Sequence, residues 1–334
     1  MLIQKDVSDD QIEQAVAVLR AGELVAFPTE TVYGLGADAT SVPAIRKIFA
    51  AKQRPADHPL IVHLSETAGL KHWASVVPRE AWQLAEAYWP GPLTMVLPRA
   101  THVASELTGG QSTIALRVPS HPVAHRLLLA FGNAIAAPSA NRFGRLSPTS
   151  AEHVREELGD AVTCILDAGD CSVGIESTIV AFRNGRAVVL RPGHITAEQI
   201  AETLQTETVP PVASSPRVSG SLPSHYAPRT PMRILDPEQF DSKLRREAAS
   251  RPVAVLARRG RPANSRAALW QIAPDSAEEY ARHLYALLRR IDSAGCELIV
   301  VEALPEQPEW TAVRDRLVRA SAQDTEAAIV ANGT

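Results

Sequence analysis

The alternation of short apolar runs with segments of helical periodicity is the feature that most constrains how this chain folds. Short apolar runs recur between Leu24 and Arg191, and between many of them apolar residues return near the helical repeat. Interspersed strands and helices build a mixed α/β fold, because an all-β fold leaves no place for the helical segments. The sequence therefore predicts a mixed α/β domain in this part of the chain.

The individual elements follow from the same patterns. We expect strands at residues 24–27, 59–64, 94–98, 113–118, 134–137, 164–168, 177–182 and 187–191. We expect a first helix between Ser8 or Asp9 as N-cap and Gly22 as stop. Further helices are expected around residues 45–51, 79–88, 122–131, 149–158 and 196–204.

The length of 334 residues exceeds what one hydrophobic core usually supports, so we expect two domains. Residues 206–231 are rich in Pro, Ser and Thr and lose periodicity, which indicates a linker. Beyond it, MRIL, VAVLA and ELIVVEAL alternate with helix-like segments at 238–249, 276–294 and 309–321, typical of a small Rossmann-like α/β/α layer. The predicted boundaries are 1–205, 206–231 and 232–334.

The composition narrows the function classes. A formal net charge of −3 supplies no protein-wide basic field for nucleic acid, so any polyanion site must be local. Three cysteines without CxxC spacing suit neither a disulfide framework nor a structural zinc site, which favours the cytoplasm. No uncharged apolar stretch approaches the ~18 residues that span a bilayer, and the first ten residues lack a signal peptide's apolar core. We therefore expect no membrane partner.

The segment FPTETVYGLGADAT, residues 27–40, is an expected loop after a strand. Thr29, Glu30 and Thr31 can bind a small polar ligand, and the two glycines of the segment let the backbone approach it closely. A tight structural turn is the alternative.

Common catalytic motifs receive no direct support. Gly34, Gly36 and Ala39 satisfy the dinucleotide spacing, but PTETVY separates them from the preceding strand, so we treat the match as coincidence. No GxxxxGK[ST], GxSxG or HExxH string occurs, so P-loop, serine hydrolase and zincin chemistry are not indicated.

The segment AKQRPADHPLIVHL, residues 51–64, places Lys52, Arg54, His58 and His63 around a proline-punctuated loop and the strand after it. Converging cations suit phosphate, because a guanidinium about 4 Å from a phosphate oxygen contributes on the order of 4 kcal/mol at an effective dielectric of ~20. A solvated basic loop is the alternative. The two histidines lack a Cys or carboxylate ligand pattern, so we expect no zinc.

The strand STIALRVP carries Thr113 and Arg117, which are an even number of residues apart and so face the same side. An arginine inside an otherwise apolar strand is costly unless it is paired. Arg117 therefore either bridges a carboxylate within the fold or awaits an anionic ligand, and the sequence leaves both alternatives open.

Two further segments carry polar groups at strand ends. The loop AAPSANRFGRLSPTS precedes a helix, and its hydroxyls, amide and main-chain N–H groups can receive phosphate and ribose oxygens or simply cap the loop. Its polar side chains are Ser139, Asn141, Ser147 and Thr149. GIESTIVAF places Glu176, Ser177 and Thr178 at a strand start, and VVLRPG places Arg191 at a strand end.

Taken in order, PTETVYGLG, KQRPADHPLIVHL, WPGPLT, TIALRVP, APSAN, SPT, ESTIV and LRPG resemble the motifs of the YrdC-type threonylcarbamoyl-AMP synthases. The match spans about residues 10–200, and SHYAPRTP followed by an α/β tail resembles the linker of the long two-domain form. The resemblance implies a twisted open mixed sheet with helices, whose concave face holds ATP and threonine beneath the linker, and a smaller Rossmann-like domain. Gln53 departs from the family pattern, in which Gly is frequent at this place.

The resemblance also implies roles for individual residues. The implied threonine-binding residues are Thr31, His63, Arg117, Ala137 and Ser177, with Arg117 pairing the substrate carboxylate. The implied ATP-binding residues are Lys52, Arg54, His58, Thr113, Ser139, Asn141, Ser147, Arg191 and Tyr226. Of these, Lys52, Arg54 and Arg191 are expected to be catalytic, because with ATP-bound Mg²⁺ they would stabilise the crowded phosphates. No organic cofactor and no metal held by the protein alone are expected.

The implied reaction converts L-threonine, bicarbonate and ATP to threonylcarbamoyl-AMP and pyrophosphate. The product would pass to a tRNA threonylcarbamoyl transferase, and a weak direct contact with tRNA is a further expectation. We expect the threonine amine to form a carbamate whose oxygen attacks the α-phosphorus, in a closed site that excludes water. The linker would provide that closure through Tyr226.

Two other classes compete with this interpretation. A noncatalytic module that binds tRNA or ribosomal RNA could use local cations on an α/β face, but the negative net charge and the 5% aromatic content disfavour it. A carbamoyl transferase of the hydrogenase-maturation type would need zinc-finger cysteine clusters, which three scattered cysteines cannot supply.

Overall fold

The computed structural model describes residues 5–332, with side chains described as far as Ala322. The chain divides into two compact units. The first comprises residues up to 143 together with 147–221, and the second comprises 144–146 together with 222 onward. Each unit combines a sheet with helices, so the predicted α/β class is confirmed for both.

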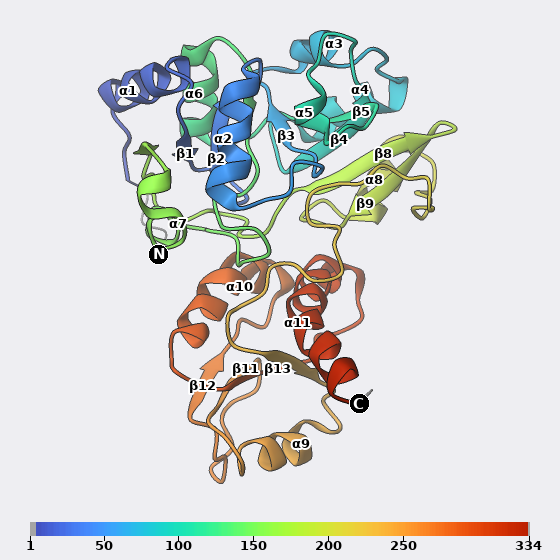
Figure 1. Ribbon diagram of the computed structural model, residues 1–334. Coiled ribbons are helices and arrows are strands. Elements are labelled where there is room, and N and C mark those ends of the chain that lie inside the picture. The colour runs from blue at the N-terminus through green and yellow to red at the C-terminus, as the bar shows by residue number, and fades with distance from the viewer. Residues whose placement is uncertain (1–4, 333–334) are drawn as a thin grey trace. The chain divides into compact units, whose positions relative to one another are not determined.

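The first unit is built on one nine-stranded sheet with the order β7-β1-β2-β6-β3-β5-β4-β8-β9. Figure 1 shows the antiparallel pair β8 and β9, which ends this order. The sheet is mixed, because the pairs β1–β7, β3–β5 and β4–β8 are parallel and the other neighbours are antiparallel. Its strands are β1 (Val25–Phe27), β2 (Gly34–Asp38), β3 (Ile61–His63), β4 (Leu93–Pro98), β5 (Thr113–Arg117), β6 (Ile135–Ala136), β7 (Cys164–Ile165), β8 (Thr178–Arg183) and β9 (Arg186–Arg191).

Helices pack on this sheet in two apolar cores. α1 and α6 share one core with Phe27 and Ile135, and α2, α4 and α8 share the other with Val62 and Leu116. Ser8 is the N-cap of α1, and its hydroxyl accepts a hydrogen bond from the Gln11 N–H. The helices are α1 (Asp9–Arg20), α2 (Val42–Lys52), α3 (Leu70–Trp73), α4 (Arg79–Tyr88), α5 (Ser105–Thr108), α6 (Pro122–Phe131), α7 (Ala151–Leu158) and α8 (Ala197–Leu204), with 3₁₀ turns at η1 (Thr67–Gly69) and η2 (Gly159–Ala161).

A third apolar cluster lies on one face of the central strands. Ala115 of β5 is paired in register with Ile61 of β3 and with Val96 of β4, so all three side chains point to the same side. Val218, from the segment 206–221, packs into this cluster and is 5% exposed. Because side chains alternate along a strand, Arg117, two residues beyond Ala115, lies on this same face. We call it the site face.

The second unit has a four-stranded parallel sheet with the order β10-β13-β11-β12, which confirms the predicted Rossmann-like layer. Its strands are β10 (Met232–Leu235), β11 (Val253–Ala257), β12 (Leu269–Ile272) and β13 (Leu298–Glu302), and its helices are α9 (Phe240–Glu247), α10 (Ala277–Asp292) and α11 (Thr311–Asn332), with a 3₁₀ turn at η3 (Pro308–Trp310). β12 was not predicted, because its partly exposed residues make no buried apolar run. Among the described residues, no helix has the length and apolarity that crossing a bilayer requires.

One strand of the first unit lies where the sequence predicted a loop. β2 pairs with both β1 and β6, so Gly34 and Gly36 belong to the sheet and begin no helix. A Cβ on Gly36 would lie 2.8 Å from Cγ2 of Ile135 and 2.8 Å from Cε1 of Phe27. Neighbouring side chains, rather than a ligand, therefore occupy the space that this glycine leaves.

Replacing Gly36 with alanine is expected to lower the free energy of unfolding by about 1–3 kcal/mol, because the added methyl overpacks a filled core. Urea denaturation measures the change. Gly260→Ala is the matched control, since a Cβ there meets nothing within 4 Å and the expected change is within about 0.5 kcal/mol. Equal stabilities of the two variants would contradict the packing role of Gly36.

Candidate active site

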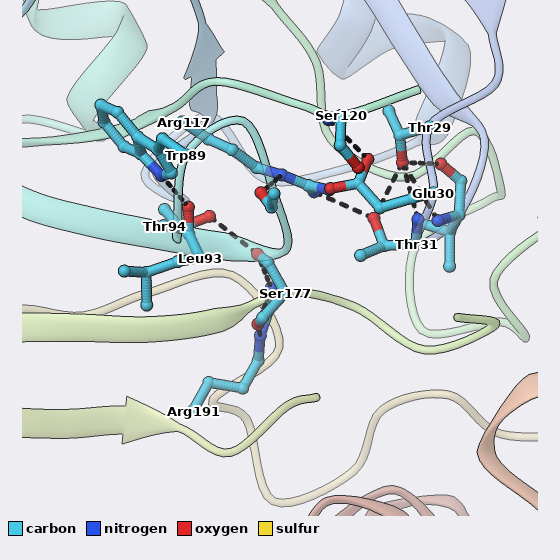
Figure 2. A network of polar contacts seen from close by, with 12 residues as sticks. Thr29, Glu30, Thr31, Trp89, Leu93, Thr94, Arg117, Ser120, Ser177 and Arg191 are labelled. Carbon is cyan, nitrogen blue, oxygen red and sulfur yellow. Dashed lines mark hydrogen bonds and ion pairs between the residues drawn. The ribbon is translucent and has the colours of Figure 1, made fainter. Parts of the chain in front are cut away.

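A network of polar contacts centres on Arg117, the last residue of β5, which is 3% exposed (Figure 2). Its Nε donates to the Gly91 carbonyl at 3.2 Å, and its Nη1 donates to Thr31 Oγ1 at 2.9 Å. Its Nη2 lies 2.7 Å from Glu30 Oε1. Of the two alternatives that the sequence left open, the structure therefore shows Arg117 paired with a carboxylate of the fold.

The loop after β1 presents Thr31 to this arginine. The Thr29 hydroxyl oxygen accepts from the main-chain N–H groups of Thr31 and Val32, both at 3.2 Å, and lies 2.8 Å from Thr31 Oγ1. Such local bonds from a side chain to the backbone are what fix a turn. Of the two alternatives for this segment, the structure shows the turn, which Thr29 fixes, and it places Thr31 against Arg117. Binding of a polar ligand by these residues stays a prediction.

A second buried arginine, Arg191, ends β9 and is 2% exposed. Its Nε and Nη2 donate to the Ser177 carbonyl at 3.1 and 2.9 Å, and its Nη1 donates to the Ser219 carbonyl at 2.9 Å. The Ser177 hydroxyl lies 2.7 Å from Thr94 Oγ1 on β4. Arg191 therefore joins a predicted threonine contact, Ser177, to the segment 206–221.

Lys52 lies buried at the end of α2 and donates to the main-chain carbonyls of Ser139 and Asn141. Burial, and next the neighbouring Arg54, lowers the pKa of Lys52 well below its ordinary value. The lysine thus anchors the loop that carries two predicted ATP contacts. Its direct contact with phosphate stays a prediction.

Arg54 and His58 lie around the ring of Phe143. The Arg54 guanidinium is 5.8 Å from the ring centroid, and its Nη2 donates to the Pro59 carbonyl at 2.8 Å. The His58 ring lies edge-on to Phe143 with centroids 5.0 Å apart. Burial, and next Arg54, lowers the pKa of His58. The two residues are therefore neighbours, as their place in one motif predicted.

The loop from Ala137 to Ser147 contacts three other site segments. The Ala137 N–H donates to the Ile61 carbonyl at 2.9 Å, and the Ser147 hydroxyl lies 2.5 Å from Glu176 Oε1. Ser139 forms a β-bridge with Gly34. This loop is thus tied to β3, to β2 and to the residue preceding Ser177.

Tyr226 belongs to the second unit, where it is 1% exposed. The Arg316 guanidinium lies 5.2 Å from its ring centroid, and the Tyr285 ring lies 5.9 Å away. The predicted contact between Tyr226 and ATP stays a prediction.

Sequence reasoning did not assign site roles to three contributors to these networks, which are Gly91, Thr94 and Glu176. It offered Glu30 as a possible ligand-binding residue and not as a partner of Arg117. Glu30 and Glu176 had a signal, because each is a carboxylate in a hydroxyl-rich segment beside a strand. Gly91 contributes a main-chain carbonyl, which the residue type does not reveal.

His63, the last residue of β3, lies beside Arg117 in the sheet register and is 3% exposed. Burial, and next the charge of Arg117, lowers the pKa of His63 to about 3. A neutral imidazole next to a guanidinium can accept or donate a hydrogen bond without adding a second positive charge.

His63 is expected to make the protein less stable in mild acid. The unfolded chain takes up a proton on this histidine below about pH 6.5, whereas the folded chain does so only near pH 3, so stability falls as the pH falls between these values. Between pH 7 and pH 5 the loss is about 2 kcal/mol. Urea unfolding at pH 7 and pH 5 measures this effect: the free energy of unfolding should decline by about 2 kcal/mol less in His63→Gln than in wild type. His283→Gln, which replaces an exposed histidine, should show the same decline as wild type.

Fold and site together define a class of protein: an α/β protein in which two buried arginines and several hydroxyls are fixed near one sheet. Such a site is suited to binding a carboxylate and a phosphate. Residues 17–193 match the Sua5/YciO/YrdC family model, described as telomere recombination. Residues 195–322 match the model described as threonylcarbamoyl-AMP synthase, C-terminal domain. The chain belongs to the Sua5/YciO/YrdC family, which confirms the resemblance of its motifs.

Relatives match nearly the whole chain. The threonylcarbamoyl-AMP synthase of Pyrococcus abyssi is 37% identical over 333 residues, which cover 96% of each chain. The threonylcarbamoyl-AMP synthase of Bacillus subtilis is 38% identical over 324 residues, which cover 94% of each chain. The crystal structure of P. abyssi Sua5 complexed with L-threonine superposes with a TM-score of 0.88 at 35% identity, over 96% of each chain.

Proposed function

We propose that this protein is an L-threonylcarbamoyladenylate synthase, which joins L-threonine, bicarbonate and ATP and releases pyrophosphate. The observation that carries the proposal is the pair of fixed arginines: Arg117 held at Thr31, and Arg191 held on Ser177. The names of relatives matched over nearly the full length, and the threonine complex of P. abyssi Sua5, support the same activity.

In the amino-acid half of the site, Arg117 pairs with the threonine carboxylate. The side chains around it suit the rest of the substrate: the Thr31 hydroxyl lies 2.9 Å from Arg117, the His63 ring lies beside it, and Ser177 bonds to Thr94 on the neighbouring strand. The neutral state of His63 fits an uncharged threonine hydroxyl.

In the nucleotide half, the chain acts as a nucleotidyltransferase. The threonine amine bonds to the carbon of bicarbonate and loses a proton while water leaves, which gives a carbamate. A carbamate oxygen then bonds to the α-phosphorus of ATP, and the bond from that phosphorus to the leaving pyrophosphate breaks. Arg191 and Arg54 offset the negative charge that accumulates, and Lys52 keeps the loop of Ser139 and Asn141 in place. Mg²⁺ would arrive on the ATP phosphates, the usual mode for this ion, and would add to the charge neutralisation.

The segment 206–221 is suited to exclude water from the carbamate. Arg217 N–H donates to Gln111 Oε1 at 2.8 Å, and Gln111 Nε2 donates to the Arg217 carbonyl at 3.0 Å. The cavity beneath this segment, beside Thr113, measures about 10 Å³, which is space for one water at most. A nucleotide can therefore occupy this cavity only if the segment moves, as a lid does.

Pyrophosphate release tests the proposal. With the full chain, release is expected to require ATP, L-threonine and bicarbonate together, and mass spectrometry should detect a nucleotide that carries the carbamoylated amino acid. Release that is independent of threonine would refute the activity. The alternative of a noncatalytic RNA-binding module predicts tRNA binding that weakens steeply with salt, without any turnover of ATP.

A further inference from the structure

Glu30 is a buried carboxylate at the centre of the threonine half of the site, and it is 5% exposed. Its Oε1 lies 2.7 Å from Arg117 Nη2, and its Oε2 accepts from the Ser120 main-chain N–H at 3.2 Å (Figure 2). The two oxygens thus have different partners. A buried carboxylate in this position is costly unless both partners are retained.

Arg117 is held through all three of its nitrogens. Nε contacts the Gly91 carbonyl, Nη1 contacts the Thr31 hydroxyl, and Nη2 contacts Glu30. Glu30 Oε1 lies at ion-pair distance from Nη2 without a hydrogen bond between them. A guanidinium carries five N–H donors, so these contacts leave at least one donor on each terminal nitrogen. Two such donors match the two oxygens of a carboxylate, which arginine binds in a bidentate manner when its plane is fixed.

The loop that carries Glu30 is itself fixed. The Glu30 carbonyl accepts from the Val173 N–H at 2.7 Å, and the preceding Thr29 hydroxyl accepts from the N–H groups of Thr31 and Val32. The carboxylate is therefore attached to a backbone bonded on both sides. A side chain on such a fixed backbone can determine the position of the side chain that it contacts.

Charge alone would not favour a carboxylate here. Glu30 offsets the positive charge of Arg117, so it weakens the attraction of the guanidinium for a second carboxylate. A site that needed only positive charge would bind an anion better without Glu30. What Glu30 adds is orientation, because the other two contacts of Arg117 are to neutral oxygens.

We propose that Glu30 is the positioning residue for amino-acid binding: it holds the plane of Arg117 so that the two remaining donors meet the substrate carboxylate. The inference rests on the proposed function for the identity of the substrate. It assigns a distinct task to a residue that touches Arg117 and not the substrate.

Two variants of the full chain test this role. Glu30→Gln keeps the shape, but its amide NH₂ must face a donor, either Arg117 Nη2 or Ser120 N–H, so one contact is lost. Glu30→Asp keeps the charge but is too short for both partners. For each variant we expect the KM for threonine, and the threonine Kd measured by calorimetry, to rise about tenfold or more, with the KM for ATP within twofold of wild type.

Glu302→Gln is the matched control. Glu302 of the second unit also has a side chain 7% exposed, lies 2.7 Å from an arginine Nη2, on Arg259, and accepts a main-chain N–H. The Glu302→Gln variant should lose thermal stability as the Glu30 variants do, but its KM for threonine should be unchanged.

Three outcomes would overturn the inference. The first is an unchanged KM and Kd for threonine. The second is a fall in either value, which would mean that Glu30 merely competes with the substrate. The third is an equal rise in the KM for threonine and the KM for ATP. If Glu30→Gln does not fold, Glu30→Asp decides. Wild-type turnover without threonine would count against the proposed function, whereas calorimetry tests Glu30 independently of turnover.

Discussion

Replacing Arg117 with lysine is expected to reduce threonine-dependent pyrophosphate release roughly 100-fold or more. Lysine keeps a positive charge beside Glu30 but offers one nitrogen, which cannot contact the Gly91 carbonyl, the Thr31 hydroxyl and Glu30 while binding a carboxylate. Each lost charge-assisted hydrogen bond costs about 1.5–3 kcal/mol, and two such losses exceed the stated factor. Steady-state kinetics with threonine varied at saturating ATP measures the effect.

Arg259→Lys controls for the loss of an arginine from an ion pair with a buried glutamate. Its partner Glu302 belongs to the second unit, so any loss of stability should resemble that of Arg117→Lys without the kinetic defect. If Arg117→Lys kept a kcat/KM for threonine within threefold of wild type, Arg117 would not be the carboxylate anchor.

The fold could be predicted where a strand or helix has its own sequence pattern. The run TIALRV predicted β5, because its alternating side chains fill both faces of the sheet. Ser8 predicted the start of α1, because its side chain makes the capping bonds. β2 could not be predicted from GLGAD, because its glycines are explained by the side chains of Phe27 and Ile135, which are distant in sequence.

Gln53 is a case in which the sequence showed a departure and the structure explains it. The residue ends α2 with a φ of 52°, the left-handed conformation that glycine adopts without strain. Gly is therefore favoured at this place, and Gln53 adopts the same backbone at a modest cost. The departure therefore affects only the C-cap of α2, and it removes no polar side chain from the site.

The candidate site was predictable as a set of residues and not as a network. Polar residues beside apolar strands marked Thr31, Arg117 and Ser177, because such residues are costly there without a task. Their partners were not predictable: Glu30 lies 87 residues before Arg117, and Arg191 and Lys52 bond to main-chain carbonyls, which every residue type offers. Pairing over such distances depends on the whole topology of the sheet.

Replacing Arg191 with glutamine is expected to lower kcat by about 10²–10³-fold, the usual cost of removing a fixed group that stabilises developing charge. It should also loosen the lid segment, because Arg191 Nη1 donates to the Ser219 carbonyl and Nη2 to the Ser177 carbonyl, and one amide cannot replace both contacts. Trypsin is therefore expected to cleave faster after the exposed Arg217, since this cleavage follows the opening of the segment.

The two effects of Arg191→Gln have separate measurements and a common control. Pyrophosphate release gives kcat, and mass spectrometry of timed digests identifies the cleavage after Arg217. Arg186→Gln, at the exposed start of the same strand β9, should change neither. A normal kcat with faster cleavage would mean that Arg191 holds the lid segment in place and does not act in the chemical step. A reduced kcat with normal cleavage would instead show that Arg191 acts on the phosphates without controlling closure, because the charge and the lid contact would then be independent.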